Sequence, residues 1–192
     1  MFQCKRIIFK LYFCIFIATF FIYIFLCSRV YSMEFENFEN NPELNWKFIS
    51  DSVMGGVSEG KIEFLKDKNS YFARMTGFVS LENDGGFIQF RKKVRDINND
   101  FVNGISVNAK GNNKKYFVHI RTTGTILPWQ YYQAPFAVDE KWKIIKIPYS
   151  AFKRSGIMLS KVIDPNNITS IAIVAYGYEH KVMVDVENIS FY

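Results

Sequence analysis

Short runs of alternating apolar and polar residues dominate the chain from Trp46 onward, and most of them end near a Gly, Asn, Asp or Pro. This period of two is typical of strands with one buried face. No stretch after residue 32 keeps a helical period, and at most residues 149–154 form one turn. The predicted strands cover residues 46–50, 60–66, 70–79, 86–94, 103–109, 114–122, 129–138, 142–147, 168–176 and 181–191.

About ten short strands without intervening helices predict an all-β antiparallel sandwich rather than a parallel α/β sheet. Residues 171–175 are apolar throughout, which predicts a central strand covered on both faces. No internal repeat is present, and the length beyond residue 32 is sufficient for one core. We therefore predict a single domain over residues 46–192, preceded at residues 33–45 by a linker or a loosely attached lead-in strand.

Residues 1–32 have the pattern of an export signal. A basic segment at 1–10 precedes an apolar run at 11–27, and a short polar stretch follows. Two interpretations remain open, a cleaved signal peptide and an uncleaved N-terminal membrane anchor, because the apolar run is at the short limit for a spanning helix. Both predict an exported protein in a periplasmic or other extracytoplasmic location.

Composition and motifs exclude several function classes. All three cysteines lie within residues 1–32, so the remaining chain offers neither a disulfide nor a cysteine-ligated zinc. Beyond residue 32, 20 basic residues stand against 18 acidic ones, and this small excess does not imply a nucleic-acid partner. His119 and His180 belong to no metal-binding motif, and no nucleophile elbow, P-loop or dinucleotide fingerprint occurs. We therefore predict no enzyme activity, no cofactor and no metal site.

Two segments, residues 51–58 and 79–87, combine a Gly-Gly pair with polar neighbours. Paired glycines permit tight reversals, and short polar side chains bond nearby backbone groups. These properties favour two structural corners, formed by Asp51, Gly55, Gly56, Ser58, Asn83, Gly85 and Gly86. The alternative is a calcium site, for which the oxygen ligands would come from Asp51, Glu82, Asn83 and Asp84.

The order and spacing of these motifs resemble the complex I intermediate-associated protein 30 family. The matching segments are Trp46, residues 51–58, 77–87 and 132–136, Trp142, and residues 147–152 and 185–192. The resemblance implies a galactose-binding-like jelly-roll sandwich. For mitochondrial members it implies an assembly chaperone of respiratory complex I. The expected partner is then a protein client, such as a respiratory complex subunit.

Alternation also predicts a polar and aromatic surface, which favours a glycan as the alternative partner. In residues 116–122 the His and Arg side chains fall opposite the buried apolar ones, and similar polar pairs occur in residues 89–91 and 131–133. Sugar-binding sandwiches use such planar polar groups and rings. An ordinary solvated strand face is the other interpretation. The candidate binding residues are Gln89, Arg91, His119, Arg121, Trp129, Tyr131 and Gln133.

Overall fold

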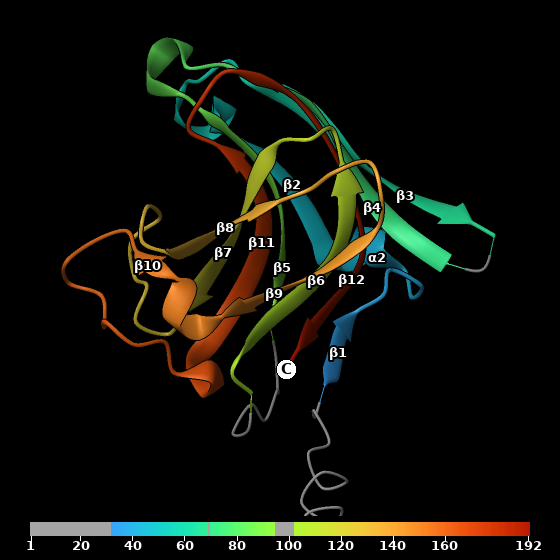
Figure 1. Ribbon diagram of the computed structural model, residues 1–192. Coiled ribbons are helices and arrows are strands. Elements are labelled where there is room, and N and C mark those ends of the chain that lie inside the picture. Colours follow the sequence, from blue (N-terminus) through green and yellow to red (C-terminus); the bar gives the residue numbers. More distant parts are fainter. Residues whose placement is uncertain (1–31, 69, 95–101) are drawn as a thin grey trace, which may run out of the picture. The chain divides into compact units, whose positions relative to one another are not determined.

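Two antiparallel sheets of six strands each pack against one another in the part of the chain that the structure describes (Figure 1). The computed structural model describes residues 32–68, 70–94 and 102–192. Residues 1–31 of the predicted export signal lie outside these ranges. Within the described ranges, no helix has the length and hydropathy that a membrane span requires.

The strand order in the two sheets joins segments that are distant in sequence. In sheet 1 the order is β3 (Glu59–Asp67), β4 (Ser70–Val79), β12 (His180–Phe191), β6 (Gly104–Gly111) and β9 (Lys143–Pro148), with β1 (Met33–Glu36) also paired to β12. In sheet 2 the order is β10 (Lys153–Arg154), β8 (Tyr132–Ala137), β7 (Lys115–Thr122), β11 (Ile168–Tyr176), β5 (Phe87–Lys93) and β2 (Trp46–Ser50). The remaining elements are single turns, α2 (Pro42–Asn45), η1 (Asp51–Met54), η2 (Glu82–Asp84), η3 (Tyr149–Ala151) and η4 (Pro165–Asn167).

The predicted strands agree closely with the observed ones. β2, β4 and β11 have the predicted bounds, and most of the others differ by one or two residues. The main departure is β8, which begins at Tyr132 because residues 123–131 form a loop. β11 is central in sheet 2, and its residues from Ser170 to Ala175 are buried, as the continuous apolar run predicted. The all-β sandwich is therefore confirmed.

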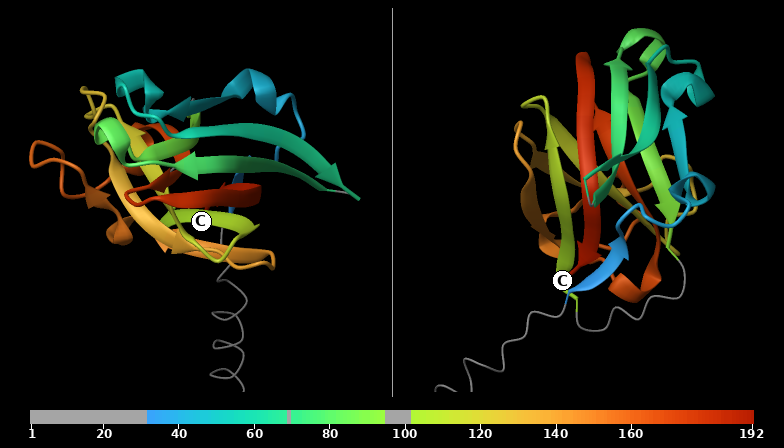
Figure 2. Two further views of the ribbon diagram at one scale, coloured as in Figure 1. Left: turned by 90° about the horizontal axis from the view of Figure 1, so that it is seen from above. Right: turned by 90° about the vertical axis from the view of Figure 1, so that its right-hand side faces the viewer.

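One apolar core lies between the two sheets, and the left view of Figure 2 shows the strands of sheet 1 side by side. Both sheets contribute to this core, because alternate side chains of their strands point to the inner face. The largest fully buried side chains are Tyr116, Phe38, Phe90, Phe191 and Met75. The hydrophobic burial of these rings and aliphatic groups is the main stabilising contribution to the fold.

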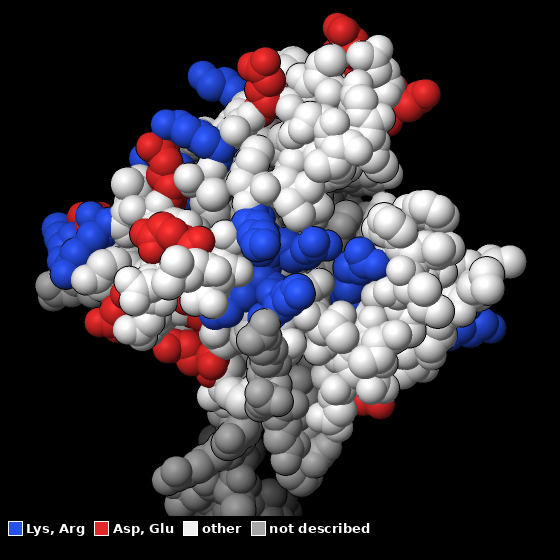
Figure 3. Space-filling view, turned by 180° about the vertical axis from the view of Figure 1, so that it is seen from behind, with Lys and Arg blue, Asp and Glu red and all other residues white. Residues whose placement is uncertain are grey.

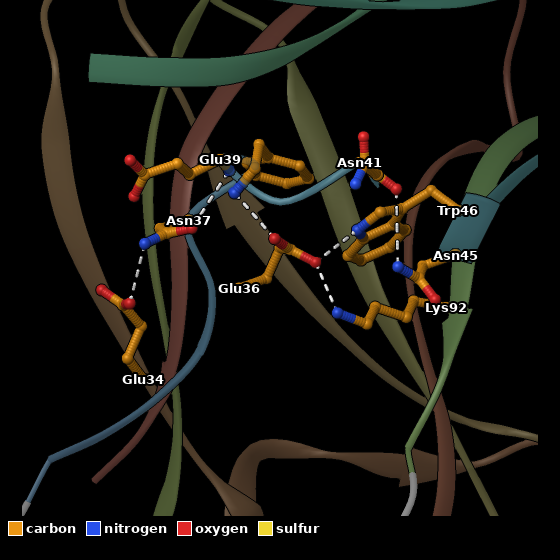
Figure 4. Close-up of polar contacts among 9 residues, drawn as sticks. Glu34, Glu36, Asn37, Glu39, Asn41, Asn45, Trp46 and Lys92 are labelled. Atoms are coloured by element: carbon orange, nitrogen blue, oxygen red, sulfur yellow. Dashed lines mark hydrogen bonds and ion pairs between the residues drawn. The ribbon is translucent and has the colours of Figure 1, made fainter. Parts of the chain in front are cut away.

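Residues 33–45 belong to the sandwich rather than to a linker, and β1 within them is a strand, as the lead-in alternative predicted. β1 pairs with the C-terminal end of β12, and Phe38 is only 1% exposed. Figure 4 shows Glu36 directed at Trp46 and Lys92: its carboxylate accepts a hydrogen bond from Trp46 Nε1 at 2.9 Å and pairs with Lys92 Nζ at 2.6 Å. The acidic, Asn-rich composition concealed this attachment, because the partners are remote in sequence.

Candidate functional site

The two Gly-Gly segments meet at the buried carboxylate of Asp51, which is 0% exposed. Its Oδ1 accepts a hydrogen bond from the backbone N of Ser58 at 2.9 Å. Its Oδ2 accepts hydrogen bonds from Ser58 Oγ and from the backbone N of Gly86 (2.6 Å) and of Phe87 (3.3 Å). One side chain therefore joins the end of β2 to the start of β5.

Each of the four glycines in these pairs lies where a side chain would be sterically unfavourable. Gly56 and Gly85 pack against Asp51, where an added Cβ would lie 2.4 Å and 2.5 Å from carboxyl atoms of that side chain. Gly55 and Gly86 have φ angles of 92° and 131°, which side chains strongly disfavour. The Gly-Gly pairs thus allow the backbone to close around a buried anion.

The structure does not gather the four proposed calcium ligands. Glu82, Asn83 and Asp84 are exposed in η2, with Asn83 in a left-handed conformation (φ 56°), whereas Asp51 is directed inward and both of its oxygens accept hydrogen bonds. Over residues 32–68, 70–94 and 102–192, no three His, Cys, Asp or Glu side chains are grouped so as to hold a metal ion.

Most of the predicted binding residues lie on one face, the outer face of sheet 2, which is directed away from the core. Strand register places Arg91 opposite Ala172, Ala172 opposite His119, and His119 opposite Gln133. Gln89 lies two residues from Arg91 and therefore on the same face. β11 separates β5 from β7, so its small side chains lie between the β5 residues and the β7 and β8 residues.

An aromatic group forms on this face from four side chains. The rings of His119 and Tyr131 stack with centroids 4.1 Å apart and an interplanar angle of 9°. Tyr176 approaches His119 at 6.2 Å and Phe117 at 6.0 Å, in both cases edge to face. Phe117 and Tyr176 were not among the predicted residues. Alternation puts Phe117 beside His119, but the place of Tyr176 depends on the pairing of β11 with β7.

Burial keeps this aromatic group uncharged. It lowers the pKa of His119 to about 4, although the neighbouring Gln133 side chain favours the protonated form. Burial also raises the pKa of Tyr131 to about 12, and Tyr176 adds to this rise. His119 Nε2 and Gln133 Oε1 have no hydrogen-bond partner within the described part of the chain. The face therefore carries a neutral ring stack, and the two unpaired polar atoms of His119 and Gln133 are buried.

Arg121 holds the neighbouring loop rather than projecting freely from the sheet. Its Nη2 donates to the carbonyl oxygens of Leu127 (2.8 Å) and Thr125 (3.2 Å). The Gln130 Oε1 accepts from the backbone N of Ile126 at 2.8 Å within the same loop, residues 123–131. Trp129 lies in this loop rather than in a strand, and its side chain is exposed.

A second loop, residues 155–163, lies beside the first (Figure 1). Ser155 Oγ donates to the carbonyl oxygen of Trp129 at 3.0 Å, and the backbone N of Ser155 donates to the carbonyl oxygen of Tyr131 at 2.9 Å. Arg154 Nη1 donates to the carbonyl oxygens of Ile157 (2.9 Å) and Leu159 (2.6 Å). Hydrogen bonds thus fix the backbone of both loops.

Large apolar side chains project from these two fixed loops into solvent. Between 38% and 87% of each is exposed. We call this set the apolar loop surface: Ile126, Leu127, Trp129, Ile157, Met158 and Val162. Only Trp129 was predicted from the sequence. The other residues of this surface could have been found from the sequence, because they are apolar residues in segments that lack strand periodicity.

Comparison with known proteins gives a family and a fold. The family model described as Complex I intermediate-associated protein 30 (CIA30) matches residues 33–183. No curated protein sequence matches the chain significantly.

Among solved structures, the chain is similar to the family 11 carbohydrate-binding module of the cellulosomal cellulase Lic26A-Cel5E of Clostridium thermocellum. The TM-score is 0.68 at 20% identity, over 85% of this chain and 95% of that one. A second structure is the family 11 module from Clostridium thermocellum in complex with a β-1,3-1,4-mixed-linked tetrasaccharide. Its TM-score is 0.69 at 21% identity, over 85% and 96% of the two chains. At such identities the likeness concerns the fold, a jelly-roll sandwich.

Proposed function

Because this chain belongs to the complex I intermediate-associated protein 30 family, we propose that it is a non-catalytic binding domain that holds a protein client, as an assembly factor does. The client is a subunit in or near a membrane respiratory complex. The observation that carries this proposal is the apolar loop surface, since contiguous exposed apolar side chains mark interaction sites. The hydrogen-bonded backbone of both loops reduces the entropy lost on binding.

We also propose that the domain is exported. This proposal is supported by the basic and apolar pattern of residues 1–32, of which 1–31 lie outside the described residues. The client would then be an extracytoplasmic part of a membrane complex. A reporter fused to the C-terminus tests it, because activity of a cytoplasmic reporter contradicts export.

Trp129→Ala and Ile157→Ala are expected to reduce client recovery at least about tenfold, because buried interface anchors carry most of the binding free energy. The measurement is native affinity purification with quantitative mass spectrometry of membrane-complex subunits. Ile144→Ala is the matched control, since Ile144 is 70% exposed but belongs to β9 of sheet 1. Equal recovery with all three variants, or no membrane-complex subunit with the unaltered chain, contradicts the proposal.

A second candidate function is glycan binding on the outer face of sheet 2. It is favoured by the stacked His119–Tyr131 pair, since a neutral planar surface with nearby hydrogen-bonding groups suits a sugar ring. The interacting partner would be an extracytoplasmic carbohydrate.

Tyr131→Ala is expected to weaken glycan affinity about tenfold, because it removes half of the stacked pair. With the unaltered chain, affinity should stay constant between about pH 5 and 8, because His119, with a pKa of about 4, is neutral throughout. A glycan array followed by calorimetry measures both effects. Tyr71→Ala on sheet 1 is the control. Loss of binding near pH 6, or no glycan bound at all, contradicts this candidate.

A further inference from the structure

A basic stripe crosses the outer face of sheet 2. Lys47 lies opposite Arg91 in the pairing of β2 with β5, and Lys93 lies on the same face two residues further along β5. Across β11, Lys93 and Arg121 both lie opposite Ser170. Figure 3 shows Lys and Arg side chains gathered in the middle of this side of the molecule. Four cations thus share one face.

These charges have no acidic partner among the residues that the structure describes. Within the described ranges, none of the four forms an ion pair, whereas the adjacent Lys92 is paired with Glu36. Burial is the main cause that lowers the pKa of Arg121, and the positive charge of Arg91 lowers it further. The second effect indicates repulsion between the two guanidinium groups. Glu34 is the one carboxylate that lines the same groove. An anion bound between the cations relieves this repulsion.

Three of the four cations line a groove beside β2 and β5. The groove has a volume of ≈ 820 Å³, and Lys47, Arg91 and Lys93 line it. Next to it, β11 turns two small side chains outward, Ser170 and Ala172, and Ala172 lies opposite both Arg91 and His119. From β2 to β7 there are three strand spacings, roughly 14 Å in all. A linear ligand that crosses the strands therefore meets cations first and rings afterward.

We propose that this face binds a carboxylated glycan, such as a polyuronate chain, which rests on the glycan-binding function proposed above. One sugar ring lies against the His119–Tyr131 stack, and carboxylates of the same chain pair with Arg91 and the neighbouring lysines. A guanidinium group matches the planar geometry of a carboxylate and donates two parallel hydrogen bonds to it. A sugar ring supplies the apolar surface that the stacked rings require.

Binding of the full chain to three polysaccharides tests the proposal, namely polygalacturonate, its methyl-esterified form and neutral mixed-linked β-glucan. Esterification removes the carboxylate charge and leaves the backbone intact. We expect at least about tenfold tighter binding to the free acid, and a smaller difference as ionic strength rises from about 0.05 to about 0.5 M. Arg91→Gln and Lys93→Gln should each reduce this preference. Lys181→Gln, an exposed site in β12 of sheet 1, should not.

The outcomes separate the two proposals. Equal affinity for the free acid and its ester overturns the preference for carboxylates and leaves glycan binding in place. Failure to bind any of the three polysaccharides overturns both. Tighter binding of polyglutamate than of polygalacturonate overturns the assignment to a glycan and indicates an acidic protein partner. Thermal unfolding of each variant checks that the substitutions on this exposed face leave the fold intact.

Discussion

Asp51→Ala is expected to lower the free energy of unfolding by about 4 kcal/mol, the largest single-residue effect that we predict. The substitution removes the acceptor of four hydrogen bonds in a fully buried position. The backbone N–H groups of Ser58, Gly86 and Phe87 are then left without that partner. Urea unfolding at pH 7 measures the change.

The pH dependence of stability tests the charge of Asp51 separately. Burial by itself raises the pKa of this carboxyl, but the hydrogen bonds that it accepts outweigh burial, and the pKa lies below the ordinary value of 3.8. A depressed pKa in the folded state contributes stability above the unfolded value, and this contribution disappears as the pH falls through the folded value. The free energy of unfolding should therefore differ most between the unaltered chain and Asp51→Asn at pH 7. This difference should shrink below about pH 4.

Asp84→Asn is the matched control for both measurements. Asp84 is exposed in the adjoining turn η2, so its neutralisation should change stability by less than about 0.5 kcal/mol. If Asp51→Asn costs no more than Asp84→Asn at pH 7, the junction between the two Gly-Gly segments does not depend on a buried charge.

Glu36→Ala is expected to lower the free energy of unfolding by about 3 kcal/mol, because it leaves several buried donors without an acceptor. The carboxylate accepts hydrogen bonds from Trp46 Nε1 (2.9 Å) and from the backbone N of Phe38 (2.7 Å), and it neutralises Lys92. Figure 4 shows the contacts of this carboxylate with Trp46 and Lys92. Chemical denaturation followed by tryptophan fluorescence measures the loss.

Two further variants define what Glu36 contributes. Glu36→Gln keeps an acceptor oxygen but not the charge, so it should lose less stability than Glu36→Ala. Glu39→Ala removes an exposed carboxylate three residues away and should change stability by less than about 0.5 kcal/mol. If Glu36→Ala and Glu39→Ala have equal effects, residues 33–45 are not an integral part of the sandwich.

The strand positions could be predicted because alternation is a local property. Tyr116, Val118 and Ile120 were expected on one face, and all three are buried. The family resemblance was likewise carried by local motifs, and the match over residues 33–183 confirms it. β10 could not be predicted, since it has two residues and obtains its stability from pairing with β8. For residues 33–45 a lead-in strand was only an alternative, because β1 has four residues and depends on pairing with β12.

The candidate surfaces were predicted only in part, for a related reason. Alternation correctly put His119 and Gln133 on the outer face of their strands, and the structure shows them directly opposite one another. Tyr176 was missed because it ends a strand that is otherwise buried. The apolar loop surface was missed apart from Trp129, since no periodicity distinguishes an exposed apolar loop from a buried one.

By itself, the sequence determined the fold class, most strand bounds and the family, because these depend on periodicity and on motifs of neighbouring residues. The tertiary structure decided which distant groups meet. It showed that Asp51 lies between the two Gly-Gly segments and that Glu36 attaches residues 33–45 to the core. It also showed that β11 lies between the cations of β2 and β5 and the His119 and Phe117 rings of β7. Strand order and register arise from long-range backbone pairing, which local alternation does not specify.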